Sequence, residues 1–340
     1  MALTATAPPK KIENLQNALC LRECKIVSVN PNRSNIFLKK VYRGGDKNFT
    51  SYKKILIPIA FKLKELKENY PMTIIYTRLK YCGYGYSLFE QILGNFQFCS
   101  DDLQPTSRVF CQFHAPQTNK MKSEILKEIS KENSKIRVIF ATTALGMGVN
   151  APFVTQVIHI RPPHNMESYL QEFGRAGRKG QKSIAVLYYN NSDISNNQNK
   201  VGEEMKTYCT LNKTCLRKNI LSYFGYSCHK QLRCCSVCNT DEEDILKHES
   251  KEVLRVISDD NLISLQKEVE KIINDWKNST DLTDYSLFDT APEIPNNLEE
   301  NILSSVIQIE SEADLLMDFN VWNSEVAEKL FKCIQNYAPL

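Results

Sequence analysis

Apolar residues recur along the first 190 positions with two alternating spacings. Short runs rich in β-branched and aromatic residues predict strands at residues 72–77, 109–114, 136–142, 154–160 and 183–189. Longer periodic segments predict helices at residues 52–68, 79–93, 119–132 and 166–176. In residues 119–132 this spacing puts Met121, Ile125, Leu126 and Ile129 on one face. Strands that alternate with helices of this length predict an α/β fold, with a mostly parallel sheet and helices on both faces.

The pattern changes after residue 191. The Asn- and Ser-rich residues 192–200 lack apolar periodicity and predict a loop at a domain boundary. A helical, cysteine-bearing segment follows, and beyond Asp241 the chain becomes acidic, with helical patterns at residues 245–276 and 298–330. We therefore expect a lobe at residues 25–191, a small subdomain at residues 192–240, and an acidic, mainly helical tail of unknown role at residues 241–340.

Composition restricts the class of protein only in part. A chain of 340 residues can hold two domains with ordinary cores. The net charge of +4 is too small to predict nucleic-acid binding by itself. The longest apolar runs, such as residues 55–61, are far shorter than a membrane span, and residues 1–11 lack the features of a secretion signal. We expect no membrane partner and a location in the nucleus, with the cytoplasm as the alternative.

The most specific chemistry lies in residues 171–180, Gln-Glu-Phe-Gly-Arg-Ala-Gly-Arg-Lys-Gly. Arg175 and Arg178 are three positions apart, a spacing that makes them neighbours on a helix. Guanidinium groups donate to phosphate oxygens, and an arginine aimed at a transferring phosphoryl group can raise the rate about 10³- to 10⁵-fold. Composition alone would favour a solvated basic turn.

The order of residues supports the phosphate interpretation, because residues 167–178 resemble motif VI of the RecQ helicases, members of helicase superfamily two. Other segments match in the family's order: residues 2–7 resemble motif III, 74–77 motif IV, 113–115 the segment after it, and 141–150 with Pro152 motif V. The resemblance implies a RecA-like second helicase lobe at residues 25–191, with residues 1–24 as the end of the first lobe and a linker. Lys179 and Leu145 depart from the usual motif residues, but neither is a proposed catalytic group.

Such a lobe implies an ATP-dependent DNA helicase that moves 3′ to 5′ and unwinds duplex DNA in repair or recombination. The resemblance makes Arg178 the arginine finger on the γ-phosphate, Arg175 its coupled neighbour, and Gln171 the sensor of nucleotide state. It also places Gly146 and Gly148 at the nucleotide cleft, with ATP and Mg²⁺ as ligands.

The resemblance implies three threonine contacts to single-stranded DNA, at Thr77, Thr142 and Thr143. Hydroxyl and amide donors suit this task because phosphate contacts hold a strand without reading its sequence. For Thr142 and Thr143 the alternative is the packing of a strand end, since threonine favours strands.

Six of the twelve cysteines lie between Cys209 and Cys238, and in a reducing compartment this density favours a metal over disulfides. Four thiolates suit a structural Zn²⁺ ion, and Cys235 and Cys238 form a Cys-x-x-Cys pair. RecQ proteins carry a zinc segment directly after the second lobe, with a helix that begins Cys-Leu-Arg and ends Tyr-Phe-Gly, as residues 215–225 do. We expect Cys215, Cys228, Cys235 and Cys238 as ligands. Cys234 is the alternative fourth ligand, and cysteines without a metal are the other interpretation.

A P-loop and an acidic pair that would hold Mg²⁺ do not occur in the sequence. We expect the chain to be the C-terminal part of a longer helicase, unable to hydrolyse ATP appreciably by itself. A second hypothesis is a truncated, non-hydrolysing module that binds DNA or a helicase partner, and a third is an RNA helicase. Arg175, Arg178 and motif V favour the first. Single-stranded and duplex DNA are the expected partners, whereas the sequence identifies no protein partner.

Overall fold

The computed structural model describes residues 7–21, 25–45, 49–99, 104–146, 149–195, 201–228, 234–238, 259–279, 294, 297–304, 306, 309, 311–317, 319, 321 and 323–337. It comprises two compact units. Unit 1 consists of Met1–Lys47, Leu66–Tyr86 and Phe98–Glu243, and unit 2 of Asn48–Glu65, Ser87–Gln97 and Asp244–Leu340. The segment resembling motif III lies outside the described residues except for Ala7.

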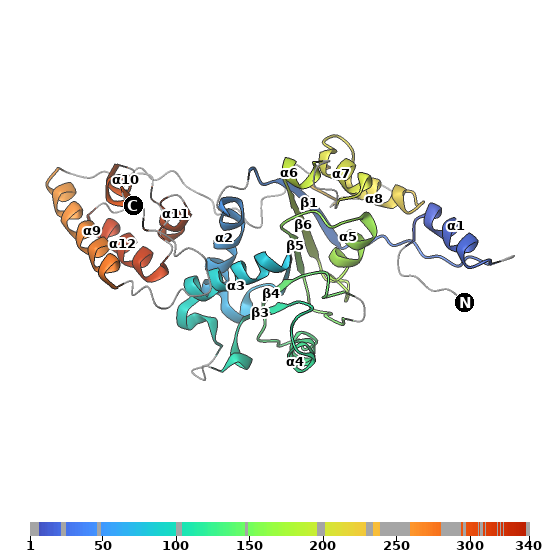
Figure 1. Ribbon diagram of the computed structural model, residues 1–340, viewed down its shortest axis with the longest axis horizontal. Helices are drawn as coiled ribbons and strands as arrows, with labels where there is room; N and C mark the ends of the chain where they lie inside the picture. The colour runs from blue at the N-terminus through green and yellow to red at the C-terminus, as the bar shows by residue number, and fades with distance from the viewer. Residues whose placement is uncertain are drawn as a thin grey trace. The chain divides into compact units, whose positions relative to one another are not determined.

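Unit 1 is built on a six-stranded parallel sheet (Figure 1). Its strands are β1 (Ile36–Tyr42), β2 (Thr73–Tyr76), β3 (Phe110–Phe113), β4 (Val138–Ala141), β5 (Gln156–His159) and β6 (Ser183–Tyr189). Their order across the sheet is β1-β6-β5-β2-β4-β3. The predicted parallel α/β sheet is confirmed, and five of the six strands lie within predicted ranges.

Helices connect most of the parallel strands, because a parallel pair needs a crossover connection. Helix α3 (Leu79–Leu93) follows β2, α4 (Asn119–Ile129) follows β3, and α5 (Met166–Phe173) follows β5. The connection from β4 to β5 contains no helix among its described residues, 142–146 and 149–155, and it is called the loop after β4.

Two local predictions were wrong. Strand β1 was missed because Lys39 and Lys40 interrupt its apolar run, yet Ile36, Phe37 and Leu38 are buried. The predicted loop at residues 192–200 begins instead with helix α6 (Asn191–Ile194). A capping box stabilises α6, in which the Asn190 and Asp193 side chains each bind the other residue's backbone amide.

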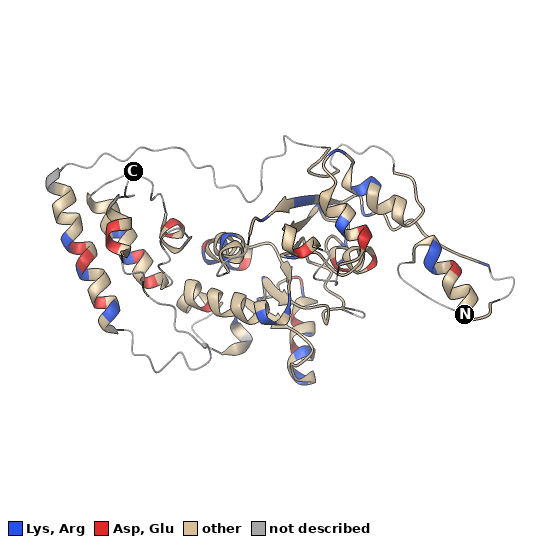
Figure 2. Cartoon of the chain, turned by 45° about the horizontal axis from the view of Figure 1, so that its top comes forward, with Lys and Arg blue, Asp and Glu red and all other residues tan. Residues whose placement is uncertain are grey.

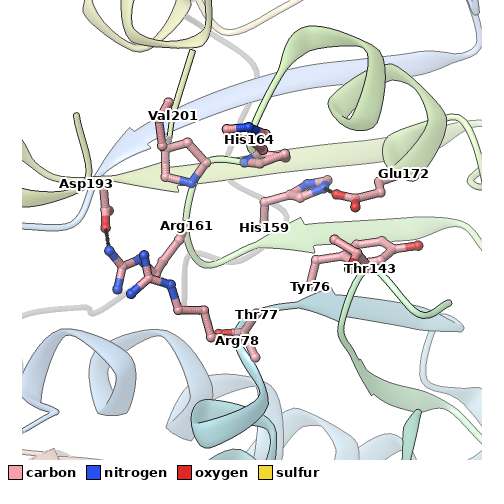
Figure 3. A pocket seen from close by; sticks show the side chains of 12 residues that line it. Tyr76, Thr77, Arg78, Thr143, His159, Arg161, His164, Glu172, Asp193 and Val201 are labelled. Carbon is pink, nitrogen blue, oxygen red and sulfur yellow. Dashed lines mark hydrogen bonds and ion pairs between the residues drawn. The ribbon is translucent and has the colours of Figure 1, made fainter. Parts of the chain in front are cut away.

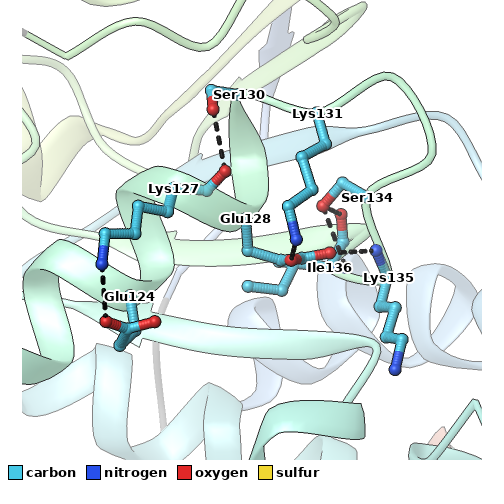
Figure 4. Close-up of polar contacts among 8 residues, drawn as sticks. All are labelled: Glu124, Lys127, Glu128, Ser130, Lys131, Ser134, Lys135 and Ile136. Atoms are coloured by element: carbon cyan, nitrogen blue, oxygen red, sulfur yellow. Dashed lines mark hydrogen bonds and ion pairs between the residues drawn. The ribbon is translucent and has the colours of Figure 1, made fainter.

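The buried surface follows the expected pattern for a parallel sheet. Every residue of the central strands β2, β4 and β5 is buried, as is typical when both faces are covered. On α4, Ile125 and Ile129 are buried and Leu126 packs against the core, but Met121 is 51% exposed. The outer face of α4 is stabilised by ion pairs from Lys127 to Glu124 and from Lys131 to Glu128 (Figure 4).

The remaining elements of unit 1 are helices before and after the sheet. Helix α1 (Pro9–Ala18) precedes β1, and α7 (Glu203–Thr210) and α8 (Leu216–Tyr223) follow α6. Three short 3-10 helices span Lys67–Asn69, Gly94–Gln97 and Pro105–Ser107.

Unit 2 is helical among its described residues. It contains nearly all of α2 (Thr50–Leu66), then α9 (Asp259–Ser279), α10 (Leu298–Ser304), α11 (Glu312–Met317) and α12 (Ser324–Tyr337). Helix α9 packs against α12, and it carries side chains of both signs along its length (Figure 2). No helix that the structure describes is both long enough and apolar enough to cross a membrane.

Gly85 in α3 provides a test of packing against the sheet. A Cβ atom at this position would lie 2.5 Å from Cε1 of Phe140, a fully buried residue of β4. We predict that Gly85→Ala lowers the free energy of unfolding by about 1–3 kcal/mol, because the ring has no space into which to move. Urea unfolding followed by circular dichroism measures this change.

Gly83 is the matched control on the same helix, since nothing lies within 4 Å of its added Cβ. Gly83→Ala is expected to leave the stability unchanged or raise it by up to about 1 kcal/mol, because alanine favours a helix. Equal destabilisation by both substitutions would contradict the packing argument.

Candidate functional site

A cavity of about 460 Å³ lies in unit 1 at the carboxyl ends of β2, β4 and β5 (Figure 3). In parallel α/β sheets this edge is where ligands bind. The cavity is lined by Tyr76, Thr77, Arg78, Thr143, His159, Arg161, Pro162, Pro163, His164, Glu172, Asp193 and Val201.

Two of the three predicted DNA-binding threonines line this cavity. Thr77 lines the cavity, and its Oγ1 atom is buried without a hydrogen-bond partner within the described part of the chain. Thr143 follows β4 on the same edge. Thr142 is not among the lining residues, and its Oγ1 accepts a hydrogen bond from the backbone amide of Ala144 at 3.3 Å. Thr142 therefore shapes the loop in this structure.

The cavity also contains basic residues that the sequence analysis missed. Asp193 accepts an ion pair from Arg161 at 2.6 Å and a second from Arg43 at 3.1 Å, and the Asp193 side chain is 1% exposed. Two guanidinium groups therefore surround one carboxylate, which leaves an excess of positive charge. Glu172 adds a negative charge to the same cavity, and Arg78 is a cation there that is exposed to a ligand.

A buried pair forms the inner wall of the cavity. Nε2 of His159 lies 2.9 Å from Oε2 of Glu172, and the ring of Tyr76 stacks on the imidazole with centroids 5.0 Å apart. The Tyr76 hydroxyl donates to the carbonyl of Leu145 at 3.2 Å. These contacts tie β2 and β5 to α5 and to the loop after β4.

The predicted phosphate-binding arginines lie in the arginine loop, defined as residues 174–181 after α5. Arg175 is 5% exposed, and its guanidinium donates to the carbonyl of Gly146. Arg178 is exposed and donates to the carbonyl of Val149 at 2.8 Å. Both arginines therefore bind the loop that also supplies Thr143.

The electrostatic environment of Arg178 reflects this crowding. Partial burial lowers the pKa of Arg178, and the nearby charges of Arg175 and Arg33 lower it further. Three guanidinium groups thus lie near one another, an arrangement that a bound anion would stabilise.

The remaining residues predicted to contact the nucleotide are Gln171, Gly146 and Gly148. Gln171 is exposed near the end of α5, and the carbonyl of Gly146 is engaged by Arg175. Gly148 lies outside the described residues. The structure thus brings Arg175, Arg178 and Gly146 together.

A second candidate site is a cysteine cluster next to β1. Sγ atoms of Cys215, Cys234, Cys235 and Cys238 all lie within 4.8 Å of one another. Cys215 Sγ is 3.3 Å from Cys234 Sγ and 3.9 Å from Cys235 Sγ. Sulfur atoms around a tetrahedral Zn²⁺, at about 2.3 Å from the ion, are about 3.8 Å apart. The dimensions of the cluster therefore fit a zinc ion.

Backbone contacts explain how the cluster forms. Cys215 is the N-cap residue of α8. Cys235 forms an isolated parallel bridge with Leu38 of β1, and Ser236 donates to the Leu38 carbonyl at 2.9 Å. Hydrogen bonds from the Cys234 thiol and from nearby backbone amides lower the pKa of Cys235 to about 4. A lowered pKa favours the thiolate, which is the form that binds metals.

The fourth member of the cluster differs from the expected ligand set. The structure places Cys234, rather than Cys228, within 4.8 Å of the other three sulfur atoms. Adjacent cysteines can share the site here because residues 234–236 follow the edge of β1. Cys228 lies beside Cys215, and its pKa is raised by burial and by that neighbouring thiol.

A family model and several known proteins match parts of this sequence. The family model described as "Helicase conserved C-terminal domain" matches residues 58–180. A protein of Acanthamoeba polyphaga mimivirus, named provisionally as an ATP-dependent RNA helicase, is 35% identical over 48% of this chain and 32% of its own length. The ATP-dependent DNA helicase Q-like 2 of Arabidopsis thaliana is 29% identical over 76% of this chain and 36% of its own length.

A third relative is named as a RecQ-like helicase. The RecQ-like DNA helicase BLM of Xenopus laevis is 27% identical over 66% of this chain and 16% of its own length. The chain therefore spans about a third or less of the length of these relatives.

We predict that Cys235→Ser abolishes stoichiometric zinc binding, because Cys235 belongs to both four-cysteine sets. Its loss should also lower the melting temperature of the zinc-loaded chain, since metal binding stabilises the folded form. Metal content by mass spectrometry and thermal unfolding measure the two effects. Cys20→Ser, at an exposed position outside the cluster, is the control and should retain zinc.

Cys228→Ser and Cys234→Ser decide the fourth ligand in the same assay. Zinc loss only in Cys228→Ser would identify the set expected from the sequence, and loss only in Cys234→Ser the set that the structure brings together. Full zinc content in Cys235→Ser would remove Cys235 from the ligand set.

Proposed function

Because the chain is a RecQ-like C-terminal helicase part, we propose that it is the second motor lobe of an ATP-dependent helicase that unwinds duplex DNA. In this proposal the arginine loop contributes to the ATP site and the cavity at the carboxyl edge holds single-stranded DNA. The lobe moves 3′ to 5′ along that strand. The first lobe supplies most of the ligands of ATP and Mg²⁺.

One observation carries the proposal, namely that a single loop connects the two sites. The loop after β4 provides Thr143 to the cavity, and its carbonyl groups at Gly146 and Val149 bind Arg175 and Arg178. A movement of the arginines on nucleotide binding or release would therefore displace the strand-binding edge. Such a connection is what a motor needs, whereas a module that only binds DNA has no need of it.

The distribution of charge supports a nucleic-acid partner more strongly than the net charge does. Residues 1–240 hold 35 of the 43 Lys and Arg residues but only 16 of the 39 Asp and Glu residues. The acidic tail therefore masks a basic excess in the part that contains the sheet. A basic excess of this kind favours binding to phosphate backbones.

At the ATP site, Arg178 would act as the arginine finger and Arg175 as its coupled neighbour. Bound ATP would supply the γ-phosphate whose developing charge a guanidinium can stabilise. Gln171, exposed near the same loop, would respond to the nucleotide state. In the cysteine cluster, a structural Zn²⁺ ion would fix the end of α8 against β1.

An RNA helicase is the second candidate, favoured by the name of the mimivirus relative. The cavity combines hydroxyl and guanidinium donors, which bind phosphates of either nucleic acid. A DNA-unwinding role in repair or recombination would place the protein in the nucleus. Unwinding of matched DNA and RNA duplexes by the protein with its first lobe separates the two, and faster unwinding of RNA would overturn the DNA assignment.

We predict that Arg178→Ala reduces DNA-stimulated ATP hydrolysis about 10³-fold or more, because an arginine finger contributes this much to phosphoryl transfer. The assay uses the chain joined to an ATP-binding first lobe, beside the 340-residue chain alone, which should be inactive. Single-strand binding should be largely unchanged in the variant.

Lys179→Ala is the matched control, since Lys179 is a neighbouring exposed cation whose Nζ lies 3.9 Å from the Phe153 ring centroid. It should retain most of the ATPase activity. Near-normal hydrolysis by Arg178→Ala would show that the finger assignment is wrong.

We predict that Arg78→Ala weakens the binding of this chain to a single-stranded oligonucleotide by about 3- to 10-fold. It should also reduce the salt dependence by about one phosphate contact. Fluorescence anisotropy at several salt concentrations measures both. Lys127→Ala removes the same charge from the ion-paired face of α4 and should leave affinity within about twofold (Figure 4). Equal losses in both variants would indicate a non-specific charge effect.

A further inference from the structure

The segment that leads into β1 is bonded to the arginine loop by two side chains. Arg33 donates to the carbonyls of Gly174 and Ala176, both at 3.0 Å. Asn35 donates to the carbonyls of Gly177 at 2.8 Å and Gln181 at 2.9 Å. Four carbonyl groups of a loop without regular structure are thus satisfied by residues about 140 positions away in the chain.

The fit between this segment and the loop is close. Gly177 has a φ of +66°, and a Cβ atom there would lie 2.3 Å from Nδ2 of Asn35. Only glycine adopts this backbone conformation and also leaves room for the Asn35 amide. The backbone amide of Gly177 in turn donates to the carbonyl of Val154 at 2.9 Å. The loop is therefore held on both sides.

Arg217 connects the same segment to the cysteine cluster. This residue of α8 is 3% exposed, and its Nη1 donates to Asn32 Oδ1 at 2.9 Å and to the Arg33 carbonyl at 2.8 Å. Its Nη2 donates to the carbonyls of Ile36 and Cys234. Arg217 also lies two positions after Cys215. One guanidinium therefore joins the backbone of Cys234, a member of the cluster, to the backbone that carries Arg33.

The chemistry of these bonds favours a positioning role. A buried guanidinium is costly unless its donors are satisfied. Both Nη groups of Arg217 donate to neutral oxygens, while Nε has no partner within the described residues. Lysine could not reproduce the arrangement, because its ammonium group lacks the planar fork. No carboxylate pairs with Arg217 in the described contacts, so the bonds fix the backbone and do not neutralise charge.

We propose that Arg33 and Arg217 are positioning residues that connect the cysteine cluster to the arginine loop. Arg217 fixes the backbone of residues 32–36 against the cluster, and Arg33 fixes the loop that presents Arg175 and Arg178. The catalytic consequence rests on the proposed function, since the loop must meet a nucleotide. The mechanical connection does not depend on it.

Hydrogen–deuterium exchange of the 340-residue chain tests the connection without ATP hydrolysis. In Arg33→Ala and in Arg217→Lys, the amides of residues 174–180 should exchange about tenfold faster than in the unchanged protein, because the loop loses bonds that restrict its opening. Arg43→Lys is the matched control: Arg43 is buried like Arg217, but it pairs with Asp193 and not with the backbone of residues 32–36. It should leave exchange at residues 174–180 unchanged.

Removal of the metal tests whether the cysteine cluster acts on the arginine loop through Arg217. Chelation of the zinc-loaded chain should accelerate exchange at residues 174–180, and this acceleration should be largely absent in Arg217→Lys, where the connection is already broken. Thermal unfolding of each variant verifies that the fold is retained, and Arg33→Ala serves if Arg217→Lys does not fold. Unchanged exchange in folded Arg33→Ala, or equal acceleration in Arg43→Lys, would overturn the proposal. Faster exchange in the variants, together with no ATPase activity of the unchanged chain joined to a first lobe, would contradict the proposed function alone.

Discussion

Parallel strand pairing is the constraint on which the rest of this lobe depends. Because β2, β4 and β5 pair in parallel and in register, Tyr76, Ala141 and His159 end at the same edge. The residues that follow these strands therefore converge although they lie far apart in the sequence. The cavity and the start of the loop after β4 derive their positions from this edge. The arginine loop precedes β6 and bonds instead to residues just before β1 and β5. An antiparallel arrangement would distribute the same side chains over two edges.

The sequence predicted the parts of the site whose signals are local. Two residues that the motifs singled out, Thr77 and Thr143, line the cavity, and apolar runs located five strands within a few residues. Strand β1 escaped detection because its lysines interrupt the apolar run. The backbone of its outer edge bonds to residues 234–236, which are far away in the sequence. Tertiary pairing, not local pattern, makes that segment a strand.

The residues that could not be predicted act through long-range contacts. Arg217 and Asn32 are 185 positions apart, and Arg161 and Asp193 meet only because α6 folds back onto β5. In the sequence alone, each of these residues looks like an ordinary polar residue of the surface. The fourth cysteine is a similar case, since adjacent thiols at positions 234 and 235 approach one another only once the chain bonds to β1. A periodic pattern records which face a residue occupies, and it contains no information on which partner it meets there.

In the arginine loop, the two arginines are held in position by hydrogen bonds that a ligand can replace. Arg175 and Arg178 donate to the neutral carbonyls of Gly146 and Val149. A phosphate oxygen is a stronger acceptor for a guanidinium than a carbonyl is, because both groups are then charged. Under the proposed function, a nucleotide can therefore replace the Val149 carbonyl as the partner of exposed Arg178, while buried Arg175 keeps its bond to the loop. The exchange would release one bond of the loop after β4 and retain the other, so that the nucleotide state reaches the strand-binding edge through the carbonyl that Arg178 leaves.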